Sequence, residues 1–411
     1  MSYTDASSTE SAEAAETAGF DVFAFDPETS RHPQEMYRAL RETGPVVSLG
    51  PMGCVITTRE AALDAFRQPE IFSSAATVDS LPLGSVRPLI PLQIDPPEHL
   101  KYRKLLDPLF APRNLAELEQ PVAALVHDLI DQFIDRGECD FSTEFSVPLP
   151  SQVFLTLLGL PLSDLALFLE MKDGIIRPDH VVGKPREHPE TAQYQKEIGA
   201  SVYDYFNEVL DDRETERRDD LLSRFLDAEV EGHRLTRDDI LDICFLFFIA
   251  GLDTVSASLD CFFGYLCDHP EQRAQLVADP SLVPSAVEEL LRWESPVGGI
   301  MRVAAQDAEF YGCPIKRGDM VSISIGSIDT DDTALPDAYE VRFDREVNPH
   351  NAFGGGVHRC LGSHLARLEL RVALREWHAR IPEYSVKPGH ELVYTPAIRS
   401  LDTFPMVFTA R

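Results

Sequence analysis

The longest helical pattern in the sequence runs from Thr236 to Leu266. Its centre reads FLFFIAGLDTVSAS and is apolar on every side of the predicted helix. A helix that is hydrophobic all round offers water no face, so it must be buried. The sequence therefore predicts a mainly α-helical fold around one long central helix, with a smaller β region between Met301 and Ile325. No apolar run reaches the ~18 residues of a membrane span, and the nearest, Ile243 to Leu252, predicts a buried core.

Residues that disfavour a helix interrupt this pattern in its middle, where the chain reads Ala250, Gly251, Leu252, Asp253 and Thr254. A glycine inside a helix costs ~1 kcal/mol relative to alanine. Aspartate and threonine compete for backbone hydrogen bonds, and a buried carboxylate needs a partner. Such conflicts inside a core element are expected at functional sites. A kinked helix with a capped aspartate is the structural alternative.

The second informative stretch is Phe353 to Gly362, which reads FGGGVHRCLG and places Cys360 behind three glycines. A helical pattern from Leu361 to Ile381 follows at once. The free N–H groups and the dipole of a helix N-terminus favour a thiolate over a thiol, and glycines let the backbone approach something flat and large. An anionic sulfur on such a shelf is what a thiolate-ligated haem iron needs. A buried structural cysteine is the ordinary alternative.

The composition narrows the class of protein further. With 411 residues, 44% apolar and 26% charged, the chain is long and apolar enough to bury a large core. Its net charge of −31 argues against nucleic acid and anionic membranes as partners. Seven cysteines without a CxxC pair indicate a reducing cytoplasm and no zinc site. Residues 1–18 predict an acidic disordered tail rather than a signal peptide, and residues 19–411 predict a single domain.

Taken together, Phe353, Gly356, His358, Cys360 and Gly362 resemble the cysteine loop of the cytochrome P450 family, the haem-thiolate monooxygenases. The run from Ala250 to Thr254 is similar to the acid–alcohol pair of that family's oxygen-binding helix. The resemblance covers roughly Pro96 to Arg411. It is closest to the soluble bacterial class that includes camphor hydroxylase, and it implies the triangular P450 fold.

Glu289 and Arg292 form an E-x-x-R pair on a predicted helix. Such a pair is usually a surface ion pair worth under ~1 kcal/mol. The P450 family has the motif in the same place before its cysteine, where it locks the irregular segment near the haem. The resemblance therefore implies a structural role for the pair. Here that irregular segment reads SIDTDDTALPDAYEVRF, which departs from the more usual Asn-Arg-Asp form.

The resemblance also implies the cofactor and the catalytic residues. The cofactor is haem b, and Cys360 is the metal ligand. Asp253 and Thr254 would deliver protons to dioxygen, for which a widened helix turn at Gly251 would make room. The remaining cofactor-binding residues are His99, Arg103, Ala250, Gly251, Arg302, Phe353, His358 and Gly362, among which the two histidines and two arginines would bind the haem propionates.

The sequence indicates the substrate less directly than it indicates the cofactor. The candidate pocket residues are mostly apolar, and they are Leu81, Leu83, Val86, Ile90, Leu246, Ile249, Ala250, Val297, Gly298, Ile300 and Ile398. Such walls predict a roomy site for a terpenoid- or steroid-like compound. Alternatively, Arg87 or Arg177 would bind a substrate carboxylate. The polar segment 179–189 predicts a flexible connection, whose open or closed state the sequence does not decide.

No flavin or iron–sulfur module is evident, so the resemblance implies a ferredoxin and its reductase as electron donors to a cytoplasmic monomer. A basic cluster is predicted to surround the cysteine and dock an acidic ferredoxin, and it comprises Lys101, Lys104, Arg113, Arg359, Arg367 and Arg371. Two other functions remain open. A peroxide-driven peroxygenase typically lacks the acid–alcohol pair, and a non-catalytic haem protein, such as a gas sensor, has no need of it.

Overall fold

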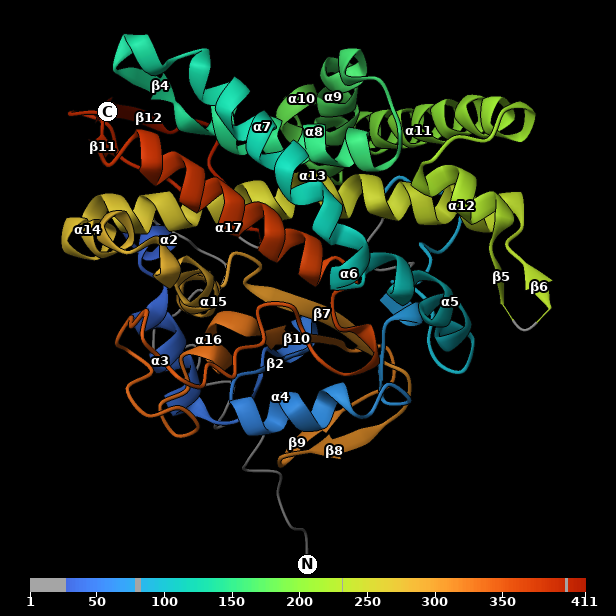
Figure 1. Cartoon of the computed structure of the whole chain (residues 1–411). Helices are drawn as coiled ribbons and strands as arrows, with labels where there is room; N and C mark the ends of the chain where they lie inside the picture. The colour runs from blue at the N-terminus through green and yellow to red at the C-terminus, as the bar shows by residue number, and fades with distance from the viewer. Residues whose placement is uncertain (1–26, 78–82, 231, 396–397) are drawn as a thin grey trace, which may run out of the picture.

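The computed structural model describes residues 27–77, 83–230, 232–395 and 398–411. The predicted tail, residues 1–18, lies outside this part of the chain. The fold is mainly helical, as predicted, with a smaller β portion. Helix α13, Arg237–Asp268, runs across the width of the molecule, with helices α7 to α11 above it and the largest sheet below it in Figure 1.

Most helices pack around α13 or cover the sheet. Their bounds are α2 Pro27–Arg31, α3 Gln34–Thr43, α4 Arg59–Phe66, α5 Glu98–Leu106, α6 Pro112–Leu115, α7 Glu119–Asp131, α8 Pro148–Leu157, α9 Leu165–Ile176, α10 Pro178–Val182, α11 Pro189–Thr215, α12 Leu221–Asp227, α14 Pro270–Ala278, α15 Val283–Glu294, α16 Ile325–Asp329 and α17 Ser363–Arg380.

The strands form two small sheets and two hairpins. The five-stranded sheet has the order β1-β2-β10-β7-β3, in which β2 and β10 are parallel and the other neighbours antiparallel. The three-stranded sheet has the order β11-β12-β4, and β5–β6 and β8–β9 are hairpins. Their bounds are β1 Val46–Ser48, β2 Cys54–Ile56, β3 Phe72–Ser73, β4 Glu138–Asp140, β5 Glu229–Val230, β6 His233–Arg234, β7 Gly299–Ala304, β8 Ala308–Phe310, β9 Cys313–Ile315, β10 Met320–Ser324, β11 Glu383–Val386 and β12 Pro405–Thr409.

Helix α13 begins where its sequence favours a helix start. The Thr236 hydroxyl accepts a hydrogen bond from the Asp239 N–H, and the Asp239 carboxylate accepts one from the Thr236 N–H. This reciprocal cap satisfies two N–H groups that the first helical turn leaves free. The helix is long and apolar enough to span a membrane by composition, but 72% of its most apolar window is buried inside the protein. It is the core helix that the sequence predicts.

The two halves of α13 belong to different apolar cores. Residues up to Leu252 pack with side chains of α8, α9 and α11. Residues from Val255 onward pack with α7, α15 and α17 around Trp377. The change from one core to the other falls at Asp253 and Thr254, the polar pair of the helix. The fold therefore places this pair at the junction of its two main cores.

One predicted connection is more ordered than the sequence suggests. Segment 179–189 was expected to be a flexible link, but α10 extends to Val182 and α11 begins at Pro189. The Arg186 guanidinium donates a 2.7 Å hydrogen bond to the carbonyl of Ile176, at the end of α9. Helical structure therefore covers both ends of the segment, where the expectation of an irregular link is wrong, and residues 183–188 between them are non-helical.

Candidate functional site

The cysteine loop is a tight structure directly before α17. The backbone N–H of Cys360 donates a 2.9 Å hydrogen bond to the carbonyl of Phe353, which closes the loop. Gly356 has a φ of 63°, and a Cβ at this position would lie 2.1 Å from the carbonyl oxygen of Phe66. Only glycine fits there, because both the backbone angle and the close approach exclude a side chain. Helix α17 begins at Ser363, two residues later than predicted.

Cys360 directly precedes the turn that leads into α17. Its side chain is accessible, yet burial raises the pKa of its thiol. The Gly362 N–H and the guanidinium groups of Arg103, Arg359 and Arg367 act in the opposite direction, but they do not outweigh burial. The helix terminus thus favours the thiolate as expected, but in the protein alone desolvation outweighs its effect on the pKa.

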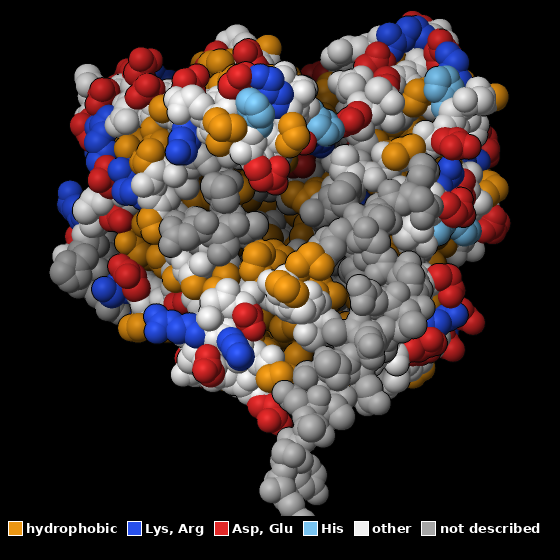
Figure 2. Space-filling view, turned by 180° about the vertical axis from the view of Figure 1, so that it is seen from behind, with side chains coloured by type: hydrophobic (Ala, Val, Ile, Leu, Met, Phe, Trp, Pro, Cys, Tyr) orange, Lys and Arg blue, Asp and Glu red, His pale blue; other side chains and the backbone are white. Residues whose placement is uncertain are grey.

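An accessible patch on α13 interrupts an otherwise buried helix. Ala250 is exposed, and Ile249, Gly251 and Thr254 are partly exposed, although the neighbouring residues Leu252 and those after Thr254 are buried. Leu361, next to Cys360, packs against the same apolar cluster as Ile249. The end of the cysteine loop and the middle of α13 therefore pack against the same apolar core. Figure 2 shows a recess near the middle of the rear face with hydrophobic side chains around it.

Gly251 has a packing role. Helix α13 is continuous from Arg237 to Asp268, and the widened turn at this glycine stays a prediction. A Cβ at position 251 would lie 3.2 Å from the Phe154 ring of α8. The glycine therefore lets α8 and α13 pack closely.

Asp253 and Thr254 point to different partners. The Thr254 hydroxyl donates a 2.9 Å hydrogen bond to the carbonyl of Ala250, one turn earlier. The Asp253 carboxylate is buried, and its Oδ1 lies 3.4 Å from Lys172 Nζ and 3.6 Å from Arg177 Nη2. The sequence analysis anticipated that this carboxylate needs a partner but missed Lys172. A single lysine within the apolar run of α9 was the available signal.

Two imidazoles meet where the propionate-binding residues were predicted. The rings of His99 in α5 and His358 in the cysteine loop have centroids 4.2 Å apart. His99 is fully buried, and neither of its ring nitrogens has a hydrogen-bond partner among the described residues. Burial, together with the nearby His358 and Arg103, lowers the pKa of His99 to about 4. Two buried imidazoles with free nitrogens are available to an external ligand.

Arg302 of β7 lies beside these histidines with little compensation for its charge. It is 7% exposed and donates a 2.7 Å hydrogen bond to the carbonyl of Met301. Burial lowers its pKa to about 10, and the carboxylate of Asp95 offsets this only in part. Asp95 Oδ1 lies 3.7 Å from His358 Nε2, too far for a hydrogen bond. Among the described residues, no carboxylate lies within ion-pair distance of Arg302.

Arg103 links this cluster to the cysteine loop. Its guanidinium donates a 2.7 Å hydrogen bond to the carbonyl of Arg359 and another of 2.7 Å to Asp107. A buried cation without a hydrogen-bonded anion is costly. The cluster of His99, Arg103, Arg302 and His358 therefore fits a ligand that carries carboxylates. Haem is such a ligand through its propionates, so these residues and the accessible thiol of Cys360 fit that cofactor.

Several predicted pocket residues share one apolar cluster. Leu83, Ile90, Leu246 and Ile249 all belong to the core around the first half of α13. Val297 and Ile398 form an isolated antiparallel bridge, which brings the C-terminal loop beside the segment after α15.

The other predicted pocket residues are placed differently. Val86 is 68% exposed and joins no apolar cluster. Ile300 packs against the core of the five-stranded sheet, with its Cδ1 close to Gly354. Gly298 is half-buried, and its carbonyl accepts a 2.9 Å hydrogen bond from the N–H of Ile325. Leu81 lies outside the described residues.

The two arginines considered for a substrate carboxylate are already paired. Arg87 Nε lies 2.8 Å from Asp242 Oδ2, and Arg177 Nη1 lies 2.6 Å from Asp402 Oδ1. A substrate carboxylate would have to displace these ion pairs. The structure therefore gives neither arginine the free guanidinium that this alternative requires.

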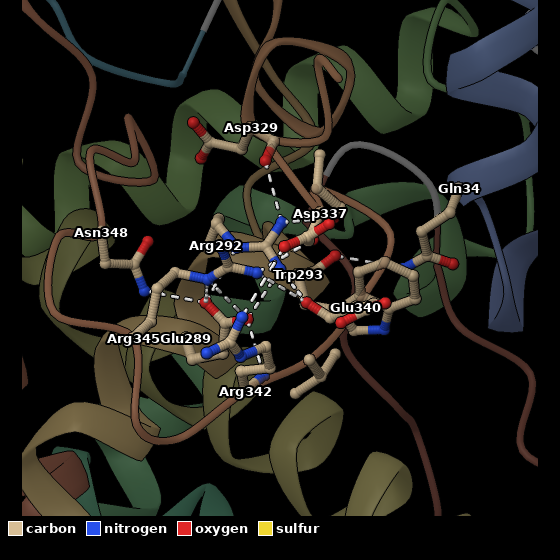
Figure 3. Close-up of polar contacts among 12 residues, drawn as sticks. Gln34, Glu289, Arg292, Trp293, Asp329, Asp337, Glu340, Arg342, Arg345 and Asn348 are labelled. Atoms are coloured by element: carbon tan, nitrogen blue, oxygen red, sulfur yellow. Dashed lines mark hydrogen bonds and ion pairs between the residues drawn. The ribbon is translucent and has the colours of Figure 1, made fainter. Parts of the chain in front are cut away.

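Glu289 and Arg292 form the centre of a buried polar network (Figure 3). The Arg292 guanidinium donates to both carboxylate oxygens of Glu289 and to the backbone carbonyls of Asp329, Ala338 and Glu340. Glu289 also accepts hydrogen bonds from residues further along the same segment, namely the Arg342 N–H, Arg345 Nε and Asn348 Nδ2. The pair therefore joins α15 to the irregular segment that precedes the cysteine loop.

The loop cysteine, the cations around it and the fold define a haem-thiolate protein. A family model for cytochrome P450 matches residues 24–279 and 273–378. The chain belongs to the cytochrome P450 family. It is a haem-dependent monooxygenase, and the iron in this family is bound by a cysteine thiolate.

Curated relatives and solved structures agree with this assignment. The chain is 34% identical over 385 residues to the steroid C26-monooxygenase of Mycolicibacterium smegmatis, covering 92% of each chain. It is 33% identical over 322 residues to cytochrome P450-terp of a Pseudomonas species, covering 77% of this chain and 75% of the relative. It is also similar to the structure of CYP109E1 from Bacillus megaterium in complex with testosterone, with a TM-score of 0.82 and 27% identity over 93% of this chain and 99% of that one.

Proposed function

We propose that this P450 hydroxylates a small hydrophobic compound of the terpenoid or steroid class, and that Cys360 is the cysteine that binds the haem iron. One observation carries the assignment of the ligand. Cys360 is accessible, three residues before α17, and the nearby His99 and Arg302 have no carboxylate within ion-pair distance among the described residues. When bound, haem supplies the activation of dioxygen, which its cysteine ligand promotes by donating electron density.

The chain's own residues have three tasks in this proposal. His99, Arg103, Arg302 and His358 hold the two propionates and so fix the orientation of the ring. Gly356 and the hydrogen bond from Cys360 to Phe353 hold the sulfur in place. Asp253 and Thr254 move protons in this proposal. The Asp253 carboxylate lies 3.6 Å from Arg177, and the Thr254 hydroxyl lies on the accessible patch of α13, so the two groups would form successive steps of a proton relay.

The substrate class rests on the apolar character of the site and on the relatives. Leu83, Ile90, Leu246 and Ile249 share one apolar cluster, and Val297 and Ile398, two further predicted wall residues, form an isolated bridge. The relatives include a steroid C26-monooxygenase, and a similar solved structure contains testosterone. Both arginines that would otherwise bind a carboxylate are paired with aspartates. These observations favour a neutral hydrophobic substrate over an acid.

The electron donor in this proposal is an acidic ferredoxin, and the enzyme works as a single-domain monomer in the cytoplasm. The described cysteines are all unpaired thiols, which suits a reducing compartment. Lys101, Arg113, Arg359 and Arg371 are exposed on α5, α6, the cysteine loop and α17, which lie together on the near face in Figure 1. Arg367 offers less free positive charge for docking than predicted, because its guanidinium donates hydrogen bonds of 2.7 and 2.8 Å to Glu288.

The iron ligand is tested by the carbon monoxide difference spectrum of the reduced protein. The wild-type protein should show the thiolate band, and Cys360→Ser should lose it. Cys267→Ser is the matched control, because Cys267 is the other cysteine in the described part of the chain that is not fully buried. A Cys360→Ser protein that keeps the band would contradict the assignment.

Substrate and donor are tested together with two measurements. A panel of terpenoids, steroids and fatty acids should give the low-to-high-spin absorbance shift with the first two groups alone. Product formation should require NADH with a ferredoxin and its reductase, and reduction should slow for Arg371→Glu in a salt-dependent manner. Efficient turnover with peroxide alone would instead favour a peroxygenase, and binding without turnover would favour a gas-binding protein.

A further inference from the structure

The cations that hold Asp253 are each shared with a second carboxylate. Lys172 Nζ lies 3.4 Å from Asp253 but 3.0 Å from Asp173. Arg177 Nη2 lies 3.6 Å from Asp253, whereas its Nη1 lies 2.6 Å from Asp402. In both cases the nearer carboxylate is the more exposed one. The side chains of Asp173 and Asp402 are 47% and 60% exposed, against 3% for Asp253.

The contacts of Arg177 show how its guanidinium is kept in this position. Arg177 follows the last residue of α9, and its Nη2 also donates a 2.7 Å hydrogen bond to the Ser400 hydroxyl. The loop that carries Ser400 and Asp402 is itself fixed, because the N–H of Leu401 donates a 3.1 Å hydrogen bond to the buried carboxylate of Asp260. Two short contacts on a fixed loop thus pull the guanidinium toward the C-terminal loop.

A guanidinium placed in this way interacts weakly with its more distant partner. At 3.6 Å the contact to Asp253 is an ion pair without a hydrogen bond, whereas the 2.6 Å contact to Asp402 is a charge-assisted hydrogen bond. The attraction between buried charges falls with distance, and a second carboxylate competes for the same cation. Asp253 is therefore neutralised enough to stay buried but is not clamped by a short hydrogen bond from either cation.

We propose that Asp402, through Arg177, is a positioning residue that keeps the hold on Asp253 weak, so that Asp253 is free to exchange protons during turnover. Asp173 acts in the same way on Lys172. Ser400 supplies a second anchor for Arg177. This inference rests on the proposed role of Asp253 in proton delivery. It also ties proton delivery to the loop that carries Ile398, a predicted contact of the substrate.

The test removes the competing charge with Asp402→Asn. Arg177 should then move onto Asp253, and turnover should fall by about threefold to tenfold, the range expected for coupling between neighbouring charged residues. The solvent isotope effect on turnover should increase, while substrate affinity from the spin shift should change less than twofold. A crystal structure of the variant holoenzyme should show an Arg177–Asp253 contact shorter than the present 3.6 Å. Asp402→Glu should restore the wild-type isotope effect.

Asp131→Asn is the matched control. Asp131 is 61% exposed and lies 2.6 Å from Arg380, so it has nearly the same exposure and ion-pair distance as Asp402, but its ion pair joins the ends of α7 and α17. This variant should leave the turnover and the isotope effect unchanged.

A double-mutant cycle separates this inference from the proposed function. If Asp253→Asn slows turnover and makes Asp402→Asn silent, the inference is supported. If Asp253→Asn slows turnover but Asp402→Asn alters neither the isotope effect nor the Arg177 position, the inference fails and the proposed function stands. Equal losses from Asp402→Asn with Asp253 present or replaced indicate a merely structural role and also overturn it. If Asp253→Asn leaves turnover and coupling unchanged, the proposed proton relay fails, and the inference fails with it.

Discussion

Arg292 donates two hydrogen bonds, of 2.9 and 2.8 Å, to the carboxylate of Glu289, and both side chains are completely buried. Burial alone would raise the pKa of Glu289, but the hydrogen bonds and charges of Arg292, with contributions from the Arg342 N–H and Arg345, hold it below its usual value. The carboxylate therefore stays ionised inside the protein. The pair joins α15 to the segment that leads into the cysteine loop.

Removal of the cation from this pair should be strongly destabilising. We expect Arg292→Ala to lower the free energy of unfolding by about 3–5 kcal/mol, because it leaves a buried carboxylate without its partner. Denaturant unfolding of the haem-loaded protein measures the change. Arg380→Ala is the control, since its ion pair with Asp131 lies at the surface and should contribute under ~1 kcal/mol. A loss as small as that of the control would refute the structural role.

Arg302 should affect the haem-free and haem-loaded proteins in opposite directions. Its guanidinium is buried, and burial lowers its pKa to about 10, so its charge costs free energy unless an anion is bound. We expect Arg302→Gln to stabilise the haem-free protein while weakening haem binding about 10- to 100-fold, as expected from the loss of one charge-assisted hydrogen bond. Unfolding of both forms and haem transfer to apomyoglobin measure the two effects. Equal destabilisation of both forms would contradict the propionate assignment.

Thr254 should control how many electrons reach the product. Its hydroxyl lies on the accessible patch of α13 and donates to the carbonyl of Ala250. We expect Thr254→Ala to oxidise NADH at a similar rate but to release most of the electrons as hydrogen peroxide, because the hydroxyl step of the relay is missing. Ser258→Ala, one helical turn later, removes a hydroxyl that donates to the carbonyl of Thr254 and should leave the coupling unchanged. If Thr254→Ala and Ser258→Ala show the same coupling of NADH oxidation to product, Thr254 has no role in the proton relay.

Asp260 should make the stability of the fold depend on pH. Burial raises its pKa from 3.8 to about 7, although Ser146, the Leu401 N–H and Ser142 hydrogen-bond its carboxylate. Because the folded protein holds this proton more tightly than the unfolded chain, the stabilisation is complete below pH 4 and is lost as the pH rises toward 7.

The size of this effect is at most ~4 kcal/mol, since each pKa unit is worth ~1.4 kcal/mol. We expect Asp260→Asn to remove the loss of stability between pH 4 and pH 7, because its side chain does not titrate. Urea unfolding of both proteins at pH 5 and pH 7.5 measures the difference. If the stability of the wild type relative to the variant does not fall over this range, Asp260 does not titrate as proposed.

Local sequence patterns were enough to predict the class of fold and the family. The apolar run of α13 must be buried, because no side of it is polar. The capping pair of Thr236 and Asp239 marks where the helix begins. The cysteine loop is recognised from its own consecutive residues, FGGGVHRCLG. These features depend on residues close together in the chain or on a steric rule, so they can be recognised without the tertiary structure.

Other features were decided only by the way distant segments meet. Asp253 needed a partner by its chemistry, but its cations come from α9 and the charge that restrains one of them, Asp402, comes from the C-terminal loop. The pKa of Cys360 is raised because the surrounding fold removes water, an effect that outweighs the cations the sequence places nearby. The sequence determined which groups this protein possesses. The tertiary structure decided how strongly each is desolvated and which charges it faces, because both depend on contacts between residues far apart in the chain.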